Sequence, residues 1–167
     1  ALPMRSYGRI CAEFYDVDKP QAPRAELTFY RSYAKEAGGP ILEPMCGSGR
    51  FLLPLMRESL DVEGTDASSA MLDRCRNQAR ILGLVPKVYQ QFLHELDLNR
   101  KFALAFIPSG SLGLLSDLDQ VRESLRRLRD HLSPKGKLVF EVEKYSPHPA
   151  YAGPWGGRWI TRPDGAK

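Results

Sequence analysis

One stretch of the chain combines two apolar runs, an acidic residue and a glycine-rich turn. Residues 41–42 lead into Glu43, a Gly-Ser-Gly turn occupies 47–49, and a second apolar run begins at Phe51. A buried strand that turns tightly into a helix has this order, and glycine permits turn angles that strain other residues. The stretch therefore predicts a strand, a turn and a helix, with a turn that a ligand can approach closely.

Helix and strand patterns alternate along most of the chain. Apolar spacing predicts helices over 25–37, 50–58, 70–82 and about 118–132, and strands over 41–43, 61–66, 87–91, 102–107 and 137–143. This alternation is typical of βαβ units around a parallel sheet. Since 167 residues suit one domain, we expect an α/β domain over 25–144 and an N-terminal arm or lid over 1–24. The Pro- and Gly-rich residues 145–167 would be the start of an insertion or a truncated C-terminal segment.

Composition argues against several classes of protein. No run approaches the roughly 18 apolar residues of a membrane span, and residues 1–9 do not read as a signal peptide. The 3 cysteines are odd in number and, like the 3 histidines, lack metal-ligand spacing. We therefore expect a reduced, cytoplasmic protein without a metal site or a membrane partner.

The net charge is +4, and much of the positive charge lies between residues 122 and 137. One interpretation is a nucleic-acid-binding patch. The other is the solvated face of a single helix. No aromatic residues interleave with these charges, which favours the solvated face, so we do not expect nucleic acid as a partner.

Acidic residues end the first two predicted strands. Glu43 ends the first and Asp66 ends the second. In open α/β sheets, ligands bind beyond the carboxyl ends of the strands, where the strand order reverses. The helix start after the turn offers free N–H groups to an anion, and an acid at the end of the second strand accepts hydrogen bonds from ribose hydroxyls. The sequence therefore predicts a site for a nucleotide-like ligand.

This pattern resembles the class I methyltransferases that use S-adenosylmethionine. In that family an acid and a glycine-rich loop follow the first strand, as in residues 43–49, and an acid, a small or polar residue and a Met follow the second, as in 62–72. The similarity covers roughly residues 25–143. Two positions depart from the family pattern: Met45 replaces a glycine of the loop, and Gln91 stands where the third-strand motif commonly has an acid.

The resemblance implies a Rossmann-like three-layer sandwich with strand order 3-2-1-4-5. The family's sheet normally has seven strands and ends in an antiparallel hairpin, for which we find no counterpart in this sequence. We therefore expect a fragment, or a chain that has lost part of the fold. Its exposed sheet edge would make it either a homo-oligomer or a marginally stable protein.

The resemblance also implies roles for the loop and the two acids. Met45, Cys46 and Gly47 would lie alongside the methionine part of S-adenosylmethionine. Glu43 would orient the loop or meet the cofactor's amino group, and Asp66 would hold the ribose. Cys46 also fits as a small loop residue, and no His or Asn is placed to make it a nucleophile.

The remaining cofactor contacts come from later motifs. Ala67 and Met71 would flank the adenine, Gln91 would offer an amide to its edge, and Phe92 would form an apolar wall. The segment from Ile107 to Ser109 would lie under the sulfonium. Met71 fits equally well as a helix core residue.

The arm and the acceptor side are less constrained by sequence. Tyr15, or Tyr7, would close over the site as a lid, although Tyr15 also fits as an anchor that packs the arm. The catalytic residues remain unknown, because methyl transfer needs a base only if the acceptor must lose a proton early. Candidates near the end of the fifth strand are Glu141, Glu143, Tyr145 and His148.

The resemblance implies a methyltransferase that acts on a small-molecule acceptor. A nonenzymatic cofactor-binding or interaction module is the alternative that the short chain supports. A nicotinamide-dependent oxidoreductase is a further alternative, which the lack of GxGxxG spacing disfavours.

Overall fold

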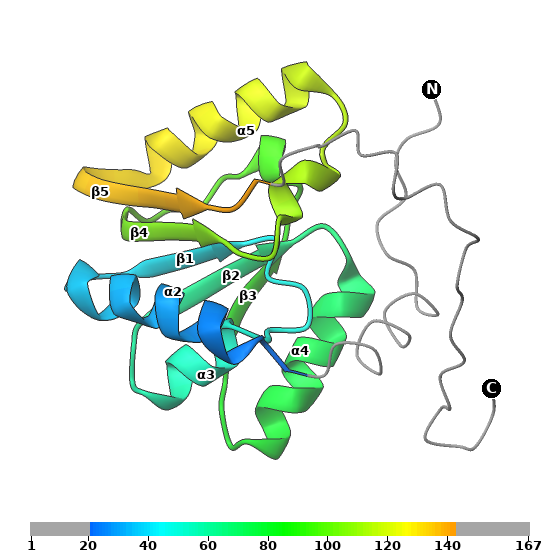
Figure 1. Cartoon of the computed structure of the whole chain (residues 1–167). Coiled ribbons are helices and arrows are strands. Elements are labelled where there is room, and N and C mark those ends of the chain that lie inside the picture. The colour runs from blue at the N-terminus through cyan, green and yellow to red at the C-terminus, as the bar shows by residue number, and fades with distance from the viewer. Residues whose placement is uncertain (1–20, 143–167) are drawn as a thin grey trace, which may run out of the picture.

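The computed structural model describes residues 21–142, and these residues form one parallel β-sheet with helices on both faces (Figure 1). The strand order is β3-β2-β1-β4-β5, and every neighbouring pair is parallel. The predicted α/β class and strand order are therefore confirmed. The strands are β1 (Ile41–Pro44), β2 (Val62–Asp66), β3 (Lys87–Gln90), β4 (Phe102–Ile107) and β5 (Leu132–Phe140).

Helices cover the two faces unequally. On one face lie α2 (Arg24–Ala37), α3 (Leu52–Arg57) and α4 (Ser69–Ile81). The other face carries α5 (Leu118–His131) and two short 3-10 helices, η1 (Leu93–Glu95) and η2 (Ser111–Leu114). The sheet is thus the middle of three layers, as expected for a Rossmann-like sandwich.

Each face of the sheet has its own apolar core. The first core joins α2, α3 and α4 to the sheet through residues such as Tyr30, Leu52 and Leu72. The second joins α5, η1 and η2 to the opposite face and includes Leu42 and Ile107. Burial of both faces explains why β1 and β4 are apolar along nearly their whole length.

Local sequence sets where the helices begin and end. Gly38 adopts a left-handed conformation directly after α2, which is a common way to end a helix. Ser68 caps α4, because its hydroxyl accepts a hydrogen bond from the Met71 N–H. Helix α3 begins at Leu52 rather than at the predicted residue 50, so the glycine turn continues two residues further than expected. Pro54 falls in its first turn, where no N–H is required.

The fifth strand begins earlier than the predicted residue 137. Leu132 already pairs with Phe102, and the pairing then shifts register so that Leu104 pairs with Lys137. The intervening residues 133–136 form an irregularity in which Lys135 has a φ of 68°. The Ser133 hydroxyl donates to the Phe102 carbonyl and attaches this irregularity to β4. The expected turn is therefore built into the strand, which ends at Phe140.

The basic residues of α5 are mostly paired within the helix. Arg126 bonds Glu123 and Asp130, and Arg127 also bonds Glu123. These pairs one turn apart support the interpretation of a solvated helix face. Among the described residues, no helix is both long and apolar enough to cross a membrane.

Candidate cofactor-binding site

The candidate site lies where the strand order reverses. Strand β1 lies between β2 and β4, so successive crossovers leave it in opposite directions. At such a point the loops beyond the strands separate and leave room for a ligand. The glycine turn at 45–50 follows β1 there, and Asp66 ends the neighbouring β2.

The turn relies on left-handed backbone conformations. Met45, Gly47 and Gly49 have φ values of 57°, 55° and 83°. Met45 therefore departs from the family pattern in residue type and still adopts a glycine-like backbone conformation. A non-glycine residue in this region costs about 1–2 kcal/mol, so the position carries strain at the candidate site.

Hydrogen bonds attach the turn to β2. The Cys46 N–H donates to the Thr65 carbonyl over 2.9 Å. The Gly47 N–H donates to Asp66 Oδ2 over 2.8 Å, and the Ser68 N–H donates to Asp66 Oδ1 over 2.8 Å. Asp66 thus joins the glycine turn to the start of α4.

Asp66 keeps capacity for further hydrogen bonds. Each carboxylate oxygen has about two acceptor positions, and each uses one on a backbone N–H. Burial raises the pKa of Asp66, whereas the N–H groups of Ser68 and Gly47 lower it. The remaining acceptor positions suit the two hydroxyls of a ribose.

Glu43 is buried at the end of β1 and lacks one partner. Glu43 is only 2% exposed, and its Oε2 has no hydrogen-bond partner. Burial raises the pKa of Glu43 well above its usual range, while a hydrogen bond from the Leu52 backbone and the charge of Arg50 lower it. A buried carboxyl oxygen without a partner is uncommon and calls for an explanation.

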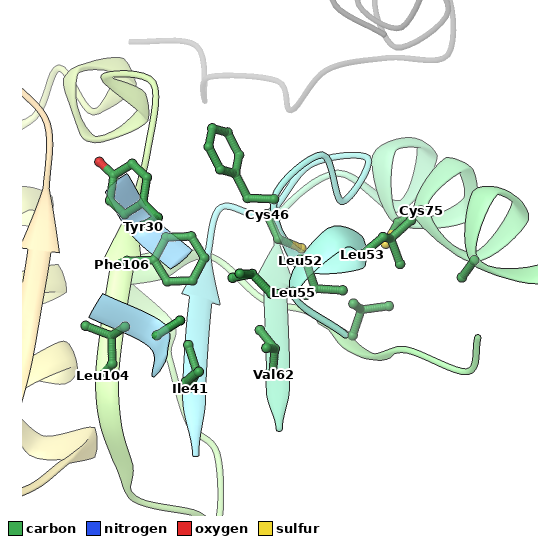
Figure 2. Close-up of a cluster of buried hydrophobic side chains, with 14 of the residues drawn as sticks. Tyr30, Ile41, Cys46, Leu52, Leu53, Leu55, Val62, Cys75, Leu104 and Phe106 are labelled. Atoms are coloured by element: carbon green, nitrogen blue, oxygen red, sulfur yellow. The ribbon is translucent and has the colours of Figure 1, made fainter. Parts of the chain in front are cut away.

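Close packing under the turn excludes any side chain at two glycines. A Cβ on Gly64 would lie 2.6 Å from Leu52 Cδ1 and 2.7 Å from Cys46 Sγ, and a Cβ on Gly49 would lie 2.6 Å from Cys75 Sγ. Figure 2 shows both cysteines in this core, with Leu52 and Leu53 between them. The turn can approach β2 and α4 this closely only because both positions are glycine.

Burial of the two cysteines of this core disfavours their thiolate forms. Burial raises the pKa of Cys75 to about 12, and burial raises the pKa of Cys46 well above its usual range. Thiolates are the reactive form, so the structure supports Cys46 as a small packing residue of the turn.

The residues expected beside the adenine follow β2 and β3 in the chain. Ala67 accepts a hydrogen bond from the Gln90 amide through its carbonyl, and Met71 is buried in the first turn of α4. Phe92 is 43% exposed and offers an apolar surface. The Gln91 side chain instead bonds the Asp97 backbone twice, as donor and as acceptor.

At the end of β4, the side chains of Ile107 and Ser109 have different surroundings. Ile107 is 0% exposed and belongs to the second core, so its side chain offers no surface to a ligand. Ser109 is exposed, and its hydroxyl donates to Glu26 Oε2 over 3.0 Å. Arg50 donates to Ser109 and to the Gln21 carbonyl. Sequence reasoning missed Glu26 and Arg50, since residues 26 and 109 are distant in sequence.

Of the base candidates, Glu141 lies within the described residues. The buried Tyr30 hydroxyl donates to Glu141 Oε1 over 2.6 Å, and burial together with Glu141 raises the pKa of Tyr30. The expectations for Tyr7, Tyr15, Glu143, Tyr145 and His148 fall outside residues 21–142. Within that range, no group of three or more His, Cys, Asp or Glu is arranged to hold a metal ion.

Comparison with known proteins identifies the family. Residues 41–136 match the family described as methyltransferase domain. The chain belongs to this methyltransferase family. A protein of Geobacillus sp. strain WCH70 that is named as a methyltransferase is 29% identical over 112 residues, which are 67% of this chain and 45% of that protein. The chain thus spans about half the length of this relative.

Solved methyltransferase structures share the fold. An S-adenosylmethionine-dependent methyltransferase from Clostridium acetobutylicum is 23% identical with a TM-score of 0.67, over 78% of this chain and 55% of that one. The CcbJ methyltransferase from Streptomyces caelestis is 27% identical with a TM-score of 0.67, over 80% and 56%. The glycopeptide N-methyltransferase MtfA, complexed with S-adenosylmethionine, is 26% identical with a TM-score of 0.59, over 69% and 53%.

Proposed function

We propose that the protein binds S-adenosylmethionine at the carboxyl ends of β1 and β2 and transfers its methyl group to a small-molecule acceptor. The observation that carries this proposal is the contact between Asp66 and the Gly47 N–H. It brings a strand-end carboxylate beside a left-handed glycine turn at the point where the strand order reverses. The family match over 41–136 supports methyl transfer as the activity.

The residues present fit this cofactor. A Cβ at Gly47 would meet no atom within 4 Å, so the turn is open on that side. The unpartnered Glu43 Oε2 suits a positively charged donor, and the exposed Phe92 suits an adenine face. The structure of MtfA with S-adenosylmethionine bound shows that a protein of this fold holds the cofactor.

The residues of this chain would mainly position the reactants. When bound, S-adenosylmethionine supplies a methyl group already activated by its sulfonium. Asp66 would accept hydrogen bonds from the ribose, and the turn at 45–49 would hold the methionine part beside Glu43. Alignment of the acceptor and exclusion of water would provide much of the rate enhancement. A general base is needed only for an acceptor that must lose a proton early, and Glu141 is the candidate for that role within the described residues.

Several further properties are part of the proposal. Neighbours such as the glycopeptide N-methyltransferase MtfA support a small-molecule acceptor. The unpaired thiols of Cys46 and Cys75 are consistent with a cytoplasmic location. Within residues 21–142, β3 and β5 each pair with one strand, and such edges favour association with a second copy.

Titration calorimetry with S-adenosylmethionine tests the proposal. Asp66→Ala removes hydrogen bonds to a charged group, each worth about 1.5–3 kcal/mol, so we expect affinity to fall roughly 10- to 150-fold for one such bond. Asp73→Ala is the matched control, because Asp73 is an exposed acid of α4 paired with Arg76. Circular dichroism checks that both variants are folded. Unchanged affinity in Asp66→Ala would contradict the ribose assignment, and binding without methyl transfer would favour a nonenzymatic module.

A further inference from the structure

The described part of the chain contains a buried acid whose charge is poorly compensated. Glu43 lies at the carboxyl end of β1, below the glycine turn, and is enclosed almost completely. Its Oε2 has no hydrogen-bond partner. An ionised carboxylate without a partner is costly in such a place, and a protonated one still lacks an acceptor for its O–H. Neither state of Glu43 is therefore well satisfied by the protein alone.

Electrostatic interactions connect Glu43 to several elements of the described part of the chain. Among the described residues, Arg50 in the turn acts on Glu43 with a positive charge, and Asp66 at the end of β2 acts on it with a negative one. Glu43 also acts on Tyr30 of α2, Cys46 of the turn and Cys75 of α4. These three groups are neutral near pH 7, because burial raises the pKa of each.

Arg50 also bonds groups other than Glu43. The Arg50 guanidinium donates to the Gln21 carbonyl and to Ser109. Burial prevails, and the pKa of Glu43 stands well above its usual range. In the ligand-free protein the carboxyl holds its proton at a pH where an exposed glutamate is ionised.

We propose that Glu43 holds a proton in the ligand-free protein and releases it to solvent when the amino-acid end of a ligand binds beside it. This inference rests on the proposed function, which puts the methionine part of the cofactor beside the turn. The ligand ammonium replaces the proton as the positive charge next to the carboxylate. The carboxyl O–H bond breaks, the proton passes to a buffer base, and the ionised oxygen accepts a hydrogen bond from the ammonium.

Two ligands separate this effect from ordinary cofactor binding. S-adenosylhomocysteine carries the amino-acid end, whereas 5′-methylthioadenosine retains the adenine, ribose and thioether without it. Asp66 also titrates in the site, but it faces the ribose that both ligands share. Any proton released only with S-adenosylhomocysteine therefore reports the amino-acid end.

The experiment is titration calorimetry of the full chain between pH 5 and 7, where the amino group of the ligand stays protonated. Each titration is repeated in buffers of different ionisation enthalpy, so that the dependence of heat on the buffer counts the protons released. In the wild-type protein we expect S-adenosylhomocysteine to release up to one proton more than 5′-methylthioadenosine does. Its affinity should also increase more steeply with pH, by up to an additional factor of ten per pH unit.

The isosteric variant Glu43→Gln provides the second comparison. It cannot release this proton, so the proton count and pH dependence for S-adenosylhomocysteine should fall to those of 5′-methylthioadenosine. Equal proton release for the two ligands in the wild-type protein would overturn the inference, and this comparison needs no variant to fold. Unaltered proton release in a folded Glu43→Gln protein would overturn it as well. If neither ligand binds, the proposed function itself fails.

Discussion

The closest packing around the glycine turn gives a quantitative prediction. In Gly49→Ala the new Cβ would meet Cys75 Sγ at 2.6 Å and Leu53 Cγ at 3.1 Å, and the residue keeps a φ of 83°. The left-handed conformation costs about 1–2 kcal/mol, and overpacking costs about 1–3 kcal/mol. Alanine also makes the unfolded chain less flexible than glycine does, which offsets roughly 0.4–1 kcal/mol of these costs. We expect the free energy of unfolding to fall by about 2–4 kcal/mol.

Gly47→Ala is the matched control for backbone strain. Gly47 lies in the same turn with a φ of 55°, and an added Cβ meets nothing within 4 Å. Backbone strain destabilises this variant, and the reduced flexibility of its unfolded chain offsets part of that effect. The net loss in the free energy of unfolding is roughly 1 kcal/mol. The difference between the two variants, about 1–3 kcal/mol, then measures the steric contact alone.

A double-mutant cycle with Cys75→Ala identifies the atom responsible. Removing the sulfur leaves the weaker contact with Leu53, so Gly49→Ala should cost about 1–2 kcal/mol in that background. Urea unfolding followed by circular dichroism gives each free energy. Equal costs for Gly47→Ala and Gly49→Ala, or a cost of Gly49→Ala that Cys75→Ala does not reduce, would refute the reasoning.

Three further predictions concern strain, charge and thiol chemistry. Because Met45 has a φ of 57°, Met45→Gly should unfold at a higher urea concentration than Met45→Ala, the reverse of the usual order. A hydrogen bond from Arg100 lowers the pKa of Asp61 in the folded protein. The Arg100–Asp61 pair therefore stabilises the protein fully above the pKa of Asp61 in the unfolded chain, near 4, and this stabilisation is lost as the pH falls through the lower pKa of the folded protein. Arg100→Leu should therefore cost more at pH 7 than at pH 3 in urea unfolding, and an equal cost at both would count against the pair. The pKa of Cys75 is raised to about 12, so peptide mapping after iodoacetamide treatment at pH 8 should find it alkylated far more slowly in native than in urea-unfolded protein.

The sequence predicts the fold well because its information is local. Apolar runs, separated by glycine and serine residues, define the helices and strands. Ser68 begins α4 and Gly38 ends α2, and both boundaries can be recognised from a few neighbouring residues. The strand order came from the family resemblance, since local patterns do not specify which strands are neighbours. The acids at 43 and 66 were found because both stand at strand ends.

The missed features depend on contacts between distant segments. The pairing of Tyr30 with Glu141 joins α2 to the end of β5, and no spacing rule links these positions. The irregular start of β5 depends on how residues 133–136 meet Phe102 of β4. The Gln91 amide is bound by the backbone of Asp97, so a residue type suited to a ligand is used to hold the chain.

The contact between Asp66 and the glycine turn has a consequence for the free energy of binding. Because the Gly47 N–H is already held before any ligand arrives, the turn is preorganised, and little conformational entropy remains to be lost on association. The attachment also means that fraying of β2 would release the turn. Local opening of this strand, measured by hydrogen exchange, should therefore set an upper limit on the fraction of molecules competent to bind.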